Sequence, residues 1–487
     1  MHTDVPLIDD IVARFRQRLI DTGAQMRSAT SPHEFFRTEQ EIHQMARELA
    51  DEYTGGILRD MAADDERTRA AAAKLREFTA DRKLTLASKG RRRTPIQLLG
   101  GSVIHVDASY MCAKRVDGER LPRRGKSGTG VFPVLDELGI TDRTTPALRL
   151  RVSHAVCEAN SVAAARELME QSGLSVSHRV ALRLTYGTSD VAVTARKRAI
   201  RATTEGNDDG EFAGRHVVAC VDGGRVRIRT ALRGRPPKGG RRKFRRDWRE
   251  PRVLTIYVLG DDGKRDKKMR SVIDGTLSDA DDVFALLLFH LRRVGAHRAA
   301  SLTLVADGAK WIWNRADALR QSLGIPDDVR FHEVVDYFHV VERLYEFARG
   351  RRRWSEKRIH RWVHQQKGRL KRGWVDRIIA SIRELLTKTE KKKGGVIDYW
   401  IRNKARLQYP AFRAAGVPIG SGAVESAVRR VINLRMKSAS TLWKEEHAEG
   451  VIHLRAHSKA RRWSEIEEVV LNNLSWTPSV RRPRKAA

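Results

Sequence analysis

The chain has 487 residues, of which 94 are lysine or arginine and 60 are aspartate or glutamate, so its formal net charge is +34. This charge favours a polyanionic partner bound through counterion release, and DNA or RNA is the usual polyanion. An apolar content of 41% excludes a disordered basic tail. The length predicts roughly two to four domains of about 100–200 residues each.

Cysteine usage and the first residues bear on the compartment. Three scattered cysteines, Cys112, Cys157 and Cys220, support neither a disulfide framework nor a cysteine-rich zinc module. The first residues include acids where a signal peptide would carry cations. No apolar run approaches the roughly 20 residues of a spanning helix. We therefore expect a cytoplasmic protein that has no membrane partner.

The N-terminal third divides into two patterns. Residues 1–95 are predicted to be helical, because apolar residues recur at helical spacing and a Ser-Pro pair begins the second helix at Ser31. This region is either a helical scaffold for dimerisation or a DNA-contacting module. Residues 96–140 change to short strands and glycine-rich turns, which predicts a small β-rich segment. Cys112 cannot hold zinc there by itself.

Residues 141–205 are again predicted to be helical. Two helices flank a turn at residues 172–175, and this spacing is that of a helix-turn-helix. An ordinary helical hairpin has the same pattern, so DNA reading is one of two interpretations. If this region reads DNA, the second helix would present His178, Arg179 and Arg183.

Residues 211–350 alternate between strand and helix patterns. Three strands come first, "RHVVACVD", "RVRIRTAL" and "RVLTIYVLG", and the first two are joined by a tight Asp-Gly-Gly turn. A helix, a strand, a helix and a strand follow. The order β-β-β-α-β-α-β is that of a ribonuclease H-like fold, so we expect the α/β class. Basic helices at 351–405 predict an α-helical insertion, after which 406–465 complete the core and 466–487 form a basic tail.

Three carboxylates lie at positions in this pattern that are typical of metal-binding acids. Asp222 and Asp307 end apolar strand-like runs, and Glu425 lies one turn into a helix that follows Gly-Ser-Gly. The first and fourth strands of a ribonuclease H-like sheet are neighbours, so the two aspartates would meet in space. Together the acids would supply oxygen ligands for two Mg²⁺ ions, or Mn²⁺ in their place, at a phosphodiester-cleaving site. Taken singly, each acid is equally well explained as a turn or helix-start residue.

Other polar and aromatic residues are weaker candidates. Asp336 and His339 form an Asp-x-x-His pair after the fifth strand. His339 is either a helix-start residue or a group that orients a metal-bound carboxylate or contacts DNA. Four further aspartates precede a helix and are expected to cap it or face solvent: Asp274, Asp279, Asp281 and Asp282. Three tryptophans are candidates for base stacking, two of them expected in the core: Trp311, Trp313 and Trp443.

The loop between the second and third strands is dense in cations. It leaves the same hairpin as Asp222, which predicts a clamp on the phosphate backbone beside the acids. Its candidate DNA contacts are Arg235, Lys238, Arg241, Arg242, Lys243, Arg245 and Arg246.

Four segments resemble those of bacterial insertion-sequence transposases of the ISKra family, which belong to the DDE transposases together with Mutator-like elements: "VDGGRVRIR", "ADGAKWIWN", "DYFHVVERL" and "PIGSGAVESAVRRVINLRMKSASTLW". The resemblance covers most of residues 95–465 and is most specific in Gly-Ser-Gly-x-x-Glu-Ser. It implies a ribonuclease H-like core interrupted by an α-helical insertion. The implied catalytic, metal-binding acids are Asp222, Asp307 and Glu425, and the implied accessory pair is Asp336 and His339.

The resemblance also implies an activity. Such enzymes bind double-stranded DNA at terminal inverted repeats, cleave donor DNA with Mg²⁺ and join the freed 3′ ends to a target. Because such a reaction brings two DNA ends together, the resemblance implies that the protein acts as a homo-oligomer. We also expect the protein to associate with the nucleoid. Relatives often carry paired Cys-x-x-Cys motifs in the β-rich segment, which this chain lacks. Two alternatives stay open: a domesticated or inactive DNA-binding protein, and a nuclease for RNA·DNA hybrids or junctions.

Overall fold

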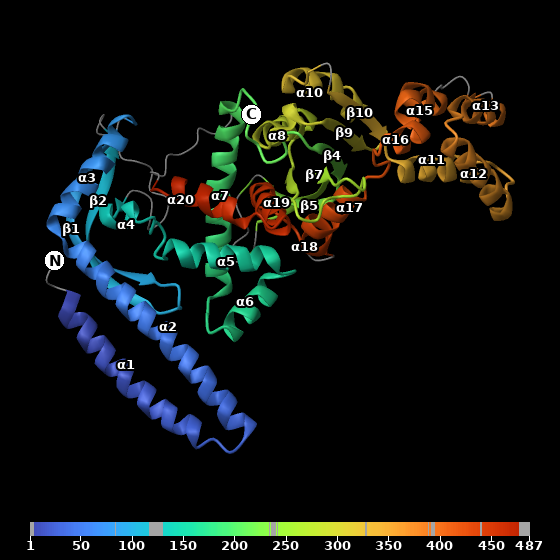
Figure 1. The fold of residues 1–487 in the computed structure, drawn as a ribbon. Coiled ribbons are helices and arrows are strands. Elements are labelled where there is room, and N and C mark those ends of the chain that lie inside the picture. Colours follow the sequence, from blue (N-terminus) through green and yellow to red (C-terminus); the bar gives the residue numbers. More distant parts are fainter. Residues whose placement is uncertain are drawn as a thin grey trace. The chain divides into compact units, whose positions relative to one another are not determined.

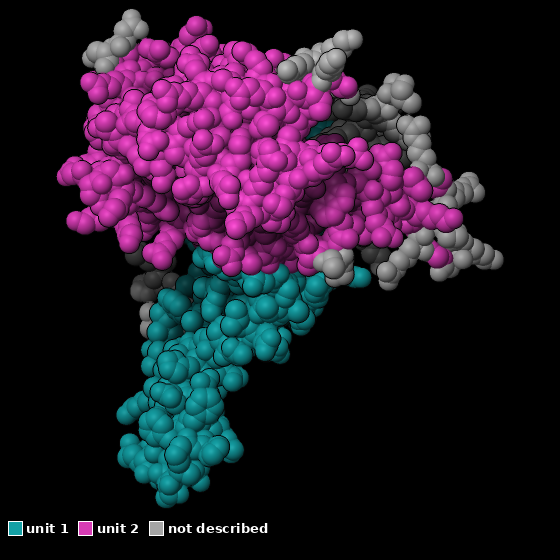
Figure 2. Space-filling view, turned by 90° about the vertical axis from the view of Figure 1, so that its right-hand side faces the viewer, with its two compact units in different colours: residues 1–191, 467–487 teal, residues 192–466 magenta. Residues whose placement is uncertain are grey.

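The computed structural model describes residues 4–82, 84–115, 130–232, 234, 240, 242–326, 329–387, 389–390, 395–438 and 441–476. The chain divides into two compact units (Figure 2). Unit 1 comprises residues 1–191 and 467–487, and unit 2 comprises residues 192–466. The helices and strands of both units are labelled in Figure 1.

Unit 1 begins with three helices, α1 (Asp4–Arg27), α2 (Pro32–Ala63) and α3 (Asp65–Ala80). The Ser-Pro signal is confirmed, because the Ser31 hydroxyl caps α2 by accepting the Glu34 N–H, and Pro32 occupies the first turn. Exposed ion pairs link α1 to α2, including Arg14 to Glu52 at 2.7 Å.

The predicted helical stretch to residue 95 is wrong in its last part. Strand β1 (Leu84–Gln97) pairs antiparallel with β2 (Val103–Arg115), and β3 (Gly130–Val131) extends this sheet. The "KGRRRTP" run lies within β1, where its charged side chains stay exposed while Thr94 and Ile96 are buried against neighbours. Charge density alone therefore misplaced the start of the β-rich segment, since an edge strand tolerates cations on its solvent face.

The helical region predicted at residues 141–205 is present as α5 (Pro146–Glu158), α6 (Val162–Gln171) and α7 (His178–Ala202). The β-rich prediction for residues 96–140 is wrong at its end, where Pro133 begins the short helix α4 (Pro133–Glu137). A short turn joins α6 to α7, and Gly173 takes a positive φ of 78° there, a conformation that favours glycine. The side chains of His178, Arg179 and Arg183 are exposed at the start of α7. Their contact with DNA stays a prediction.

Asp136 makes the stability of unit 1 depend on pH. Burial raises the pKa of this carboxyl to about 6, although the Trp476 backbone N–H donates to it. Its folded-state pKa thus lies above the value of 3.8 for a free aspartate. The stabilisation is complete at low pH and is lost as pH rises through about 6.

We expect Asp136→Asn to stabilise the protein at about pH 8 by on the order of 1 kcal/mol and to leave its stability nearly unchanged at about pH 4, because an amide avoids burying a charge and the site is partly exposed. Urea unfolding followed by circular dichroism at both pH values measures this. Asp21→Asn on the exposed face of α1 is the control. A gain from Asp136→Asn of the same size at both pH values would contradict the assignment.

Unit 2 is built on a five-stranded mixed sheet, which confirms the α/β class. Its strands in spatial order are β10 (Arg330–Val335), β9 (Ser301–Ala306), β4 (His216–Gly223), β7 (Arg252–Leu259) and β8 (Val272–Thr276). The central strand β4 is parallel to β9 and antiparallel to β7. Its buried run "VVACV" is typical of a strand covered on both faces.

One of the three strands predicted at the start of this sheet does not join it: "RVLTIYVLG" forms β7 of the sheet as expected, but the strand predicted before it lies elsewhere. The run "RVRIRTAL" forms β5 (Val226–Ala231), which leaves the sheet and pairs with β6 (Phe244–Arg249) in a separate two-stranded ribbon. It alternates buried Val226 and Ile228 with arginines, a pattern that suits a half-exposed ribbon. The third sheet strand is β8, a short apolar run that includes Asp274.

Helices complete unit 2. The first three are α8 (Ala280–Arg293), α9 (Lys310–Trp313) and α10 (Ala316–Leu323). The predicted insertion, residues 351–405, contains α12 (Glu356–Lys371), α13 (Val375–Leu385) and α15 (Gly395–Asn403). Helix α11 (Tyr337–Arg349) precedes it and α16 (Tyr409–Ala414) follows it, and these helices gather beyond β10 (Figure 1). The last helical segments are α17 (Gly422–Val428), η4 (Arg429–Asn433), α18 (Leu434–Met436) and α19 (Glu445–Lys459). Helix α20 (Trp463–Asn473) begins in unit 2 and continues into the C-terminal part of unit 1.

The length and hydropathy of the helices can be compared with those of a membrane span in the described part of the chain. None of its helices combines the length and the apolar character that crossing a bilayer requires.

Candidate active site

Two predicted acids lie side by side where the parallel strands of the unit 2 sheet reach their carboxyl ends, and we call this end of the sheet the sheet edge. Strands β4 and β9 are parallel, and Val221 pairs with Ala306. Asp222 and Asp307 are the next residues of the two strands, so both stand where the strands end. Strand β10 continues this edge, because Val335 pairs with Ala306 on its other side and is followed by Asp336.

Local contacts hold the two aspartates in their turns. The Asp222 Oδ1 accepts the Gly223 N–H at 2.7 Å, and the Asp307 Oδ1 accepts the Ala309 N–H at 3.0 Å. The Trp313 Nε1–H donates to the backbone carbonyl of Asp307 at 2.7 Å. Both side chains are half-buried, which leaves carboxylate oxygens accessible at the edge of the sheet.

The turn after Asp307 also depends on the insertion. A Cβ on Gly308 would lie 2.1 Å from a ring carbon of Tyr399 in α15, so only glycine fits beneath that ring. The Arg343 guanidinium of α11 lies 4.4 Å from the centre of the same ring. The insertion thus packs directly on the Asp307 turn.

Glu425 reaches this edge from the first turn of α17. Its side chain is exposed, and the Ser421 hydroxyl donates to Oε1 at 3.3 Å. The helix continues into the π-helical segment η4. Buried Arg455 of α19 donates to the carbonyls of Arg430 at 2.6 Å and Val431 at 3.0 Å, which anchors the helix.

Asp336 ties the start of α17 to the sheet. Its Oδ1 caps α11 by accepting the N–H groups of Phe338 at 2.6 Å and His339 at 3.0 Å. Its Oδ2 accepts the Ser421 N–H, and the neighbouring Tyr337 N–H donates to the Ile419 carbonyl at 2.9 Å. Asp336 is fully buried, so it acts as a structural acceptor that places Glu425 close to Asp222 and Asp307.

Asp336 and His339 each stabilise the charged form of the other. Burial would raise the pKa of Asp336, but hydrogen bonds from His339 and Ser421 hold it at about 2. The Asp336 carboxylate, 3.5 Å from His339 Nδ1, raises the pKa of His339 to about 9 despite burial. At neutral pH the pair is therefore a carboxylate and an imidazolium, and the latter also attracts Asp222.

The three predicted acids interact electrostatically. Burial raises the pKa of Asp222, and the negative charges of Asp307 and Glu425 raise it further, against the opposing effects of the Gly223 N–H and His339. A divalent cation would relieve this repulsion, and carboxylate oxygens are the ligands that Mg²⁺ prefers. The residue types of Asp222, Asp307 and Glu425 suit Mg²⁺, although their ligand atoms do not all lie within 4.8 Å of one another. Asp336 fits less well as a ligand, because backbone N–H groups already engage both of its oxygens.

The distances between possible metal-ligand atoms differ among the acids of the site. Among the described residues, two groups of three bring their ligand atoms within 4.8 Å of one another: Asp336 with His339 and Glu425, and Asp274 with His453 and His457. The predicted triad is not such a group, so Glu425 lies tightest against the Asp336–His339 pair. The roles of all five residues stay predictions.

Four of the seven cations predicted to contact the phosphate backbone lie on or beside the β5–β6 ribbon, and their contact with DNA stays a prediction. Arg242, Lys243, Arg245 and Arg246 are exposed on or beside β6, whereas Arg235, Lys238 and Arg241 lie outside the described residues. The paired register places Arg227 opposite Trp248 and Arg229 opposite Arg246 on one face. The prediction did not include Arg227, Arg229 or Trp248, although the alternation of arginine in "RVRIR" signals an exposed basic face.

The tryptophan expectation is confirmed. Trp313 and Trp443 are buried, with 4% and 5% of their surfaces exposed. Trp311 is half-buried against Phe284 and lies beneath the Arg252 guanidinium. Of the three, Trp313 contributes to the position of an acid, because its Nε1–H hydrogen bond holds the Asp307 turn.

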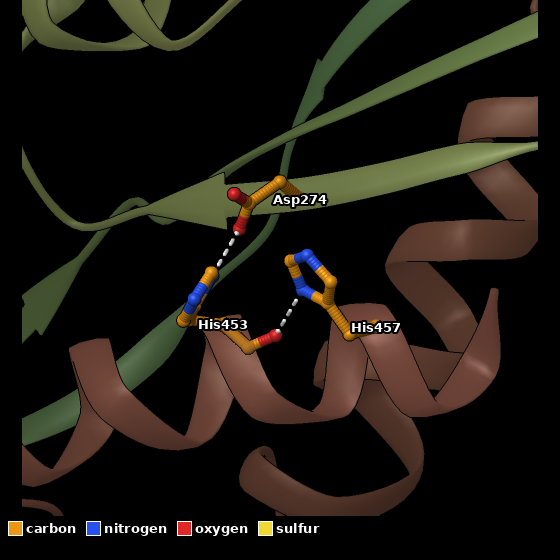
Figure 3. Close-up of side chains that lie close together, drawn as sticks. All are labelled: Asp274, His453 and His457. Atoms are coloured by element: carbon orange, nitrogen blue, oxygen red, sulfur yellow. Dashed lines mark hydrogen bonds and ion pairs between the residues drawn. The ribbon is translucent and has the colours of Figure 1, made fainter. Parts of the chain in front are cut away.

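A second polar cluster is fully buried and was not predicted (Figure 3). Asp274 was expected to cap a helix or face solvent, but it lies within β8 and none of its surface is exposed. His453 Nδ1 of α19 lies 3.0 Å from Asp274 Oδ1, and His290 Nε2 of α8 lies 2.9 Å from Oδ2. The helix-cap expectation holds instead for Asp279, which accepts the N–H groups of Asp281 and Asp282.

Arg196 supplies the positive charge of this buried cluster. Its guanidinium donates to Asp274 at 2.9 Å and to Glu449 at 2.5 Å. Burial opposes the charge of Asp274, but Arg196 and His453 hold the pKa of that carboxyl well below its usual range. Burial lowers the pKa of His290 to about 4 and that of His453 to about 3, so both imidazoles are neutral.

Neutral imidazoles and a carboxylate could hold a metal ion, and His453 and His457 have the i, i+4 spacing that signals such a pair. His457 Nδ1 instead bonds to the His453 carbonyl at 3.0 Å (Figure 3). The Arg196 guanidinium also lies 3.2 Å from His453 Nδ1, where it would repel a cation. The geometry favours a self-neutralised structural network.

Comparison with known proteins yields no matching family model, no similar curated protein and no similar solved structure. The sequence motifs and the geometry of the sheet edge are therefore the basis for a functional proposal.

We expect Asp336→Asn to destabilise unit 2 by about 2–3 kcal/mol. The variant keeps an oxygen for the α11 cap but turns an amide donor toward the buried Ser421 N–H. Chemical unfolding of the whole chain measures the change. Asp279→Asn is the matched control, because Asp279 caps α8 with the same oxygen and has no equivalent of the Ser421 contact; its expected effect is within about 0.5 kcal/mol. Equal losses in the two variants would contradict the role of the Ser421 contact.

We expect Arg196→Met to cost about 3–5 kcal/mol, because it leaves the buried Asp274 carboxylate without its cation. Thermal and urea unfolding measure the loss. Arg298→Met is the control, since Arg298 pairs with Asp208 at 3.2 Å on the surface, where both side chains are more than half exposed. Its expected loss is below about 1 kcal/mol. Unchanged stability in Arg196→Met would show that the cluster does not need an internal cation.

Proposed function

We propose that this protein is a DNA transposase that cuts and joins phosphodiester bonds at the edge of the unit 2 sheet. The observation that carries the proposal is the placement of Asp222 and Asp307 at the paired ends of β4 and β9, within electrostatic reach of Glu425. The resemblance of the surrounding motifs to those of ISKra-family DDE transposases supplies the reaction class.

The topology of the sheet supports a ribonuclease H-like core. The spatial order β8-β7-β4-β9-β10 has three antiparallel strands in sequence order on one side and two parallel strands on the other. This arrangement makes the first strand central and the fourth its neighbour, which brings their terminal aspartates together. The helical insertion between β10 and α17 explains why Glu425 is so distant in the sequence.

The proposed chemistry uses carboxylates to hold divalent cations. Asp222, Asp307 and Glu425 would hold two Mg²⁺ ions, or Mn²⁺ in their place, and the ions would activate the attacking oxygen and stabilise the leaving one. Asp336 holds Glu425 at this position through the start of α17. The imidazolium of His339 lies beside Asp222 and offers a positive charge to a phosphate oxygen of the bound strand.

The charge distribution supports DNA as the substrate. The net charge of +34 favours a long polyanion, and the exposed cations of β6 belong to the ribbon that starts directly after Asp222 and the two glycines. Double-stranded element ends would lie along this ribbon, while the α6–α7 hairpin of unit 1 presents His178, Arg179 and Arg183 for further contacts. Joining two ends requires at least two copies of the chain.

The test is metal-dependent nicking of a plasmid that carries the DNA flanking the coding sequence. We expect nicking and strand transfer with Mg²⁺ or Mn²⁺, and a loss of about 100-fold or more in Asp222→Asn, Asp307→Asn and Glu425→Gln, because each removes a carboxylate that would hold the divalent cations. DNA binding, measured by fluorescence anisotropy with Ca²⁺, should persist in all three.

Asp317→Asn on the exposed face of α10 is the control and should keep full activity. Binding without nicking in the unsubstituted protein would favour an inactive DNA-binding protein. Cleavage confined to RNA·DNA hybrids or branched DNA would favour a nuclease. Full activity in Glu425→Gln would remove that residue from the proposed triad.

A further inference from the structure

A cavity of about 500 Å³ opens within the helical insertion, between α12 and the end of α13. Its walls combine aromatic, cationic and hydroxyl side chains, a combination that the proposed chemistry at the sheet edge does not use. Pockets of this size commonly bind small organic molecules. The lining residues that matter to the argument are Trp354, Trp362, Lys357, Arg358, Arg361 and Ser381.

Two tryptophans form the apolar part of the pocket. Trp354 is half-buried, and 9% of the Trp362 surface is exposed. Their ring centres lie 5.9 Å apart at an angle of 67°. The Trp362 Nε1–H donates to the Ser381 hydroxyl at 3.2 Å, and Phe347 packs 5.4 Å behind the same ring. Trp362 is therefore held in place by its neighbours, while Trp354 offers a less constrained aromatic surface.

Three exposed cations line the same cavity. Lys357, Arg358 and Arg361 lie on the first two turns of α12, and the Arg358 guanidinium is 4.7 Å from the centre of the Trp354 ring. Glu384 is the acid in the lining, so the balance of charge there is positive. Polar groups that can contact a heterocycle are also present in Ser381 and Gln365.

We propose that this pocket binds a nucleotide, with the base against Trp354 and the phosphate on Lys357, Arg358 and Arg361. Phosphate alone would not account for the aromatic wall, and an uncharged aromatic ligand would not account for the three cations. A nucleotide unites both requirements, because every base has a face that stacks on tryptophan and its phosphate pairs with lysine and arginine. The ligand is either a free nucleotide or an unpaired nucleotide of a strand, and both present this chemistry.

The proposal does not depend on the nature of the reaction at Asp222, Asp307 and Glu425. The pocket is formed by residues 354–385 alone, and its lining contains none of the acids of the sheet edge. Failure of one proposal would therefore leave the other standing.

The test measures binding to the full-length protein by fluorescence anisotropy. The probes are fluorescent adenosine monophosphate and a labelled short duplex with one unpaired adenine, each against unlabelled competitors: adenosine, inorganic phosphate and the fully paired duplex. We expect adenosine monophosphate to compete at least about 10-fold better than adenosine or phosphate, because stacking and charge act together.

Two variants separate the pocket from the general positive charge of the chain. Arg361→Glu reverses a lining cation and should weaken nucleotide binding by about 10-fold or more. Arg383→Glu on α13 is the matched control, since it is exposed and makes the same charge change without lining the cavity. Trp354→Leu should weaken binding of the nucleotide by about 5-fold or more and leave binding of phosphate unchanged.

The outcomes decide whether the pocket binds a nucleotide and whether that nucleotide is free or part of a strand. Competition between the monophosphate and the unpaired duplex, with both weakened by Arg361→Glu, supports one site that accepts either form. Binding of only the free nucleotide or only the unpaired strand supports the site and identifies its ligand. Equal weakening by Arg361→Glu and Arg383→Glu, or equal competition by phosphate and the monophosphate, would overturn it.

Discussion

The buried carboxylate of Asp336 is the contact on which the arrangement of the acids depends. It directly follows the last strand of the sheet, caps α11 and accepts the N–H of Ser421 at the start of α17. Glu425 therefore reaches the sheet edge through one side chain that joins three elements. Because hydrogen bonds hold the pKa of Asp336 at about 2, the acceptor stays ionised across the physiological range.

The two acidic clusters of unit 2 differ in how their charge is neutralised. Asp274 has no exposed surface and has Arg196 within hydrogen-bond distance, so an internal cation neutralises its charge. At the sheet edge, Asp222 instead feels the negative charges of Asp307 and Glu425, with His339 as the nearby cation that opposes them. Repulsion between carboxylates at a partly exposed edge is expected of a site that binds a cation. This contrast favours the sheet edge over the buried cluster as the functional site.

The helical insertion contributes to the site as well as separating its parts. Tyr399 closes over Gly308 and thereby shapes the turn that holds Asp307. The same insertion carries the aromatic and cationic cavity between α12 and α13. One helical segment therefore both packs on the Asp307 turn and forms the cavity for which we propose nucleotide binding.

The sequence by itself determined the α/β class, the helical character of the insertion and the positions of Asp222 and Asp307 at strand ends, because apolar runs and turn residues are local signals. It also supplied the resemblance on which the reaction class depends. Only the tertiary structure decided that β5 leaves the sheet, that β8 completes it and that Asp274 is buried, since each depends on which distant segment covers a strand. The anchoring of Glu425 by Asp336 and Ser421 is likewise a tertiary fact: hydrogen bonds between residues 85 positions apart leave no periodic pattern in the chain.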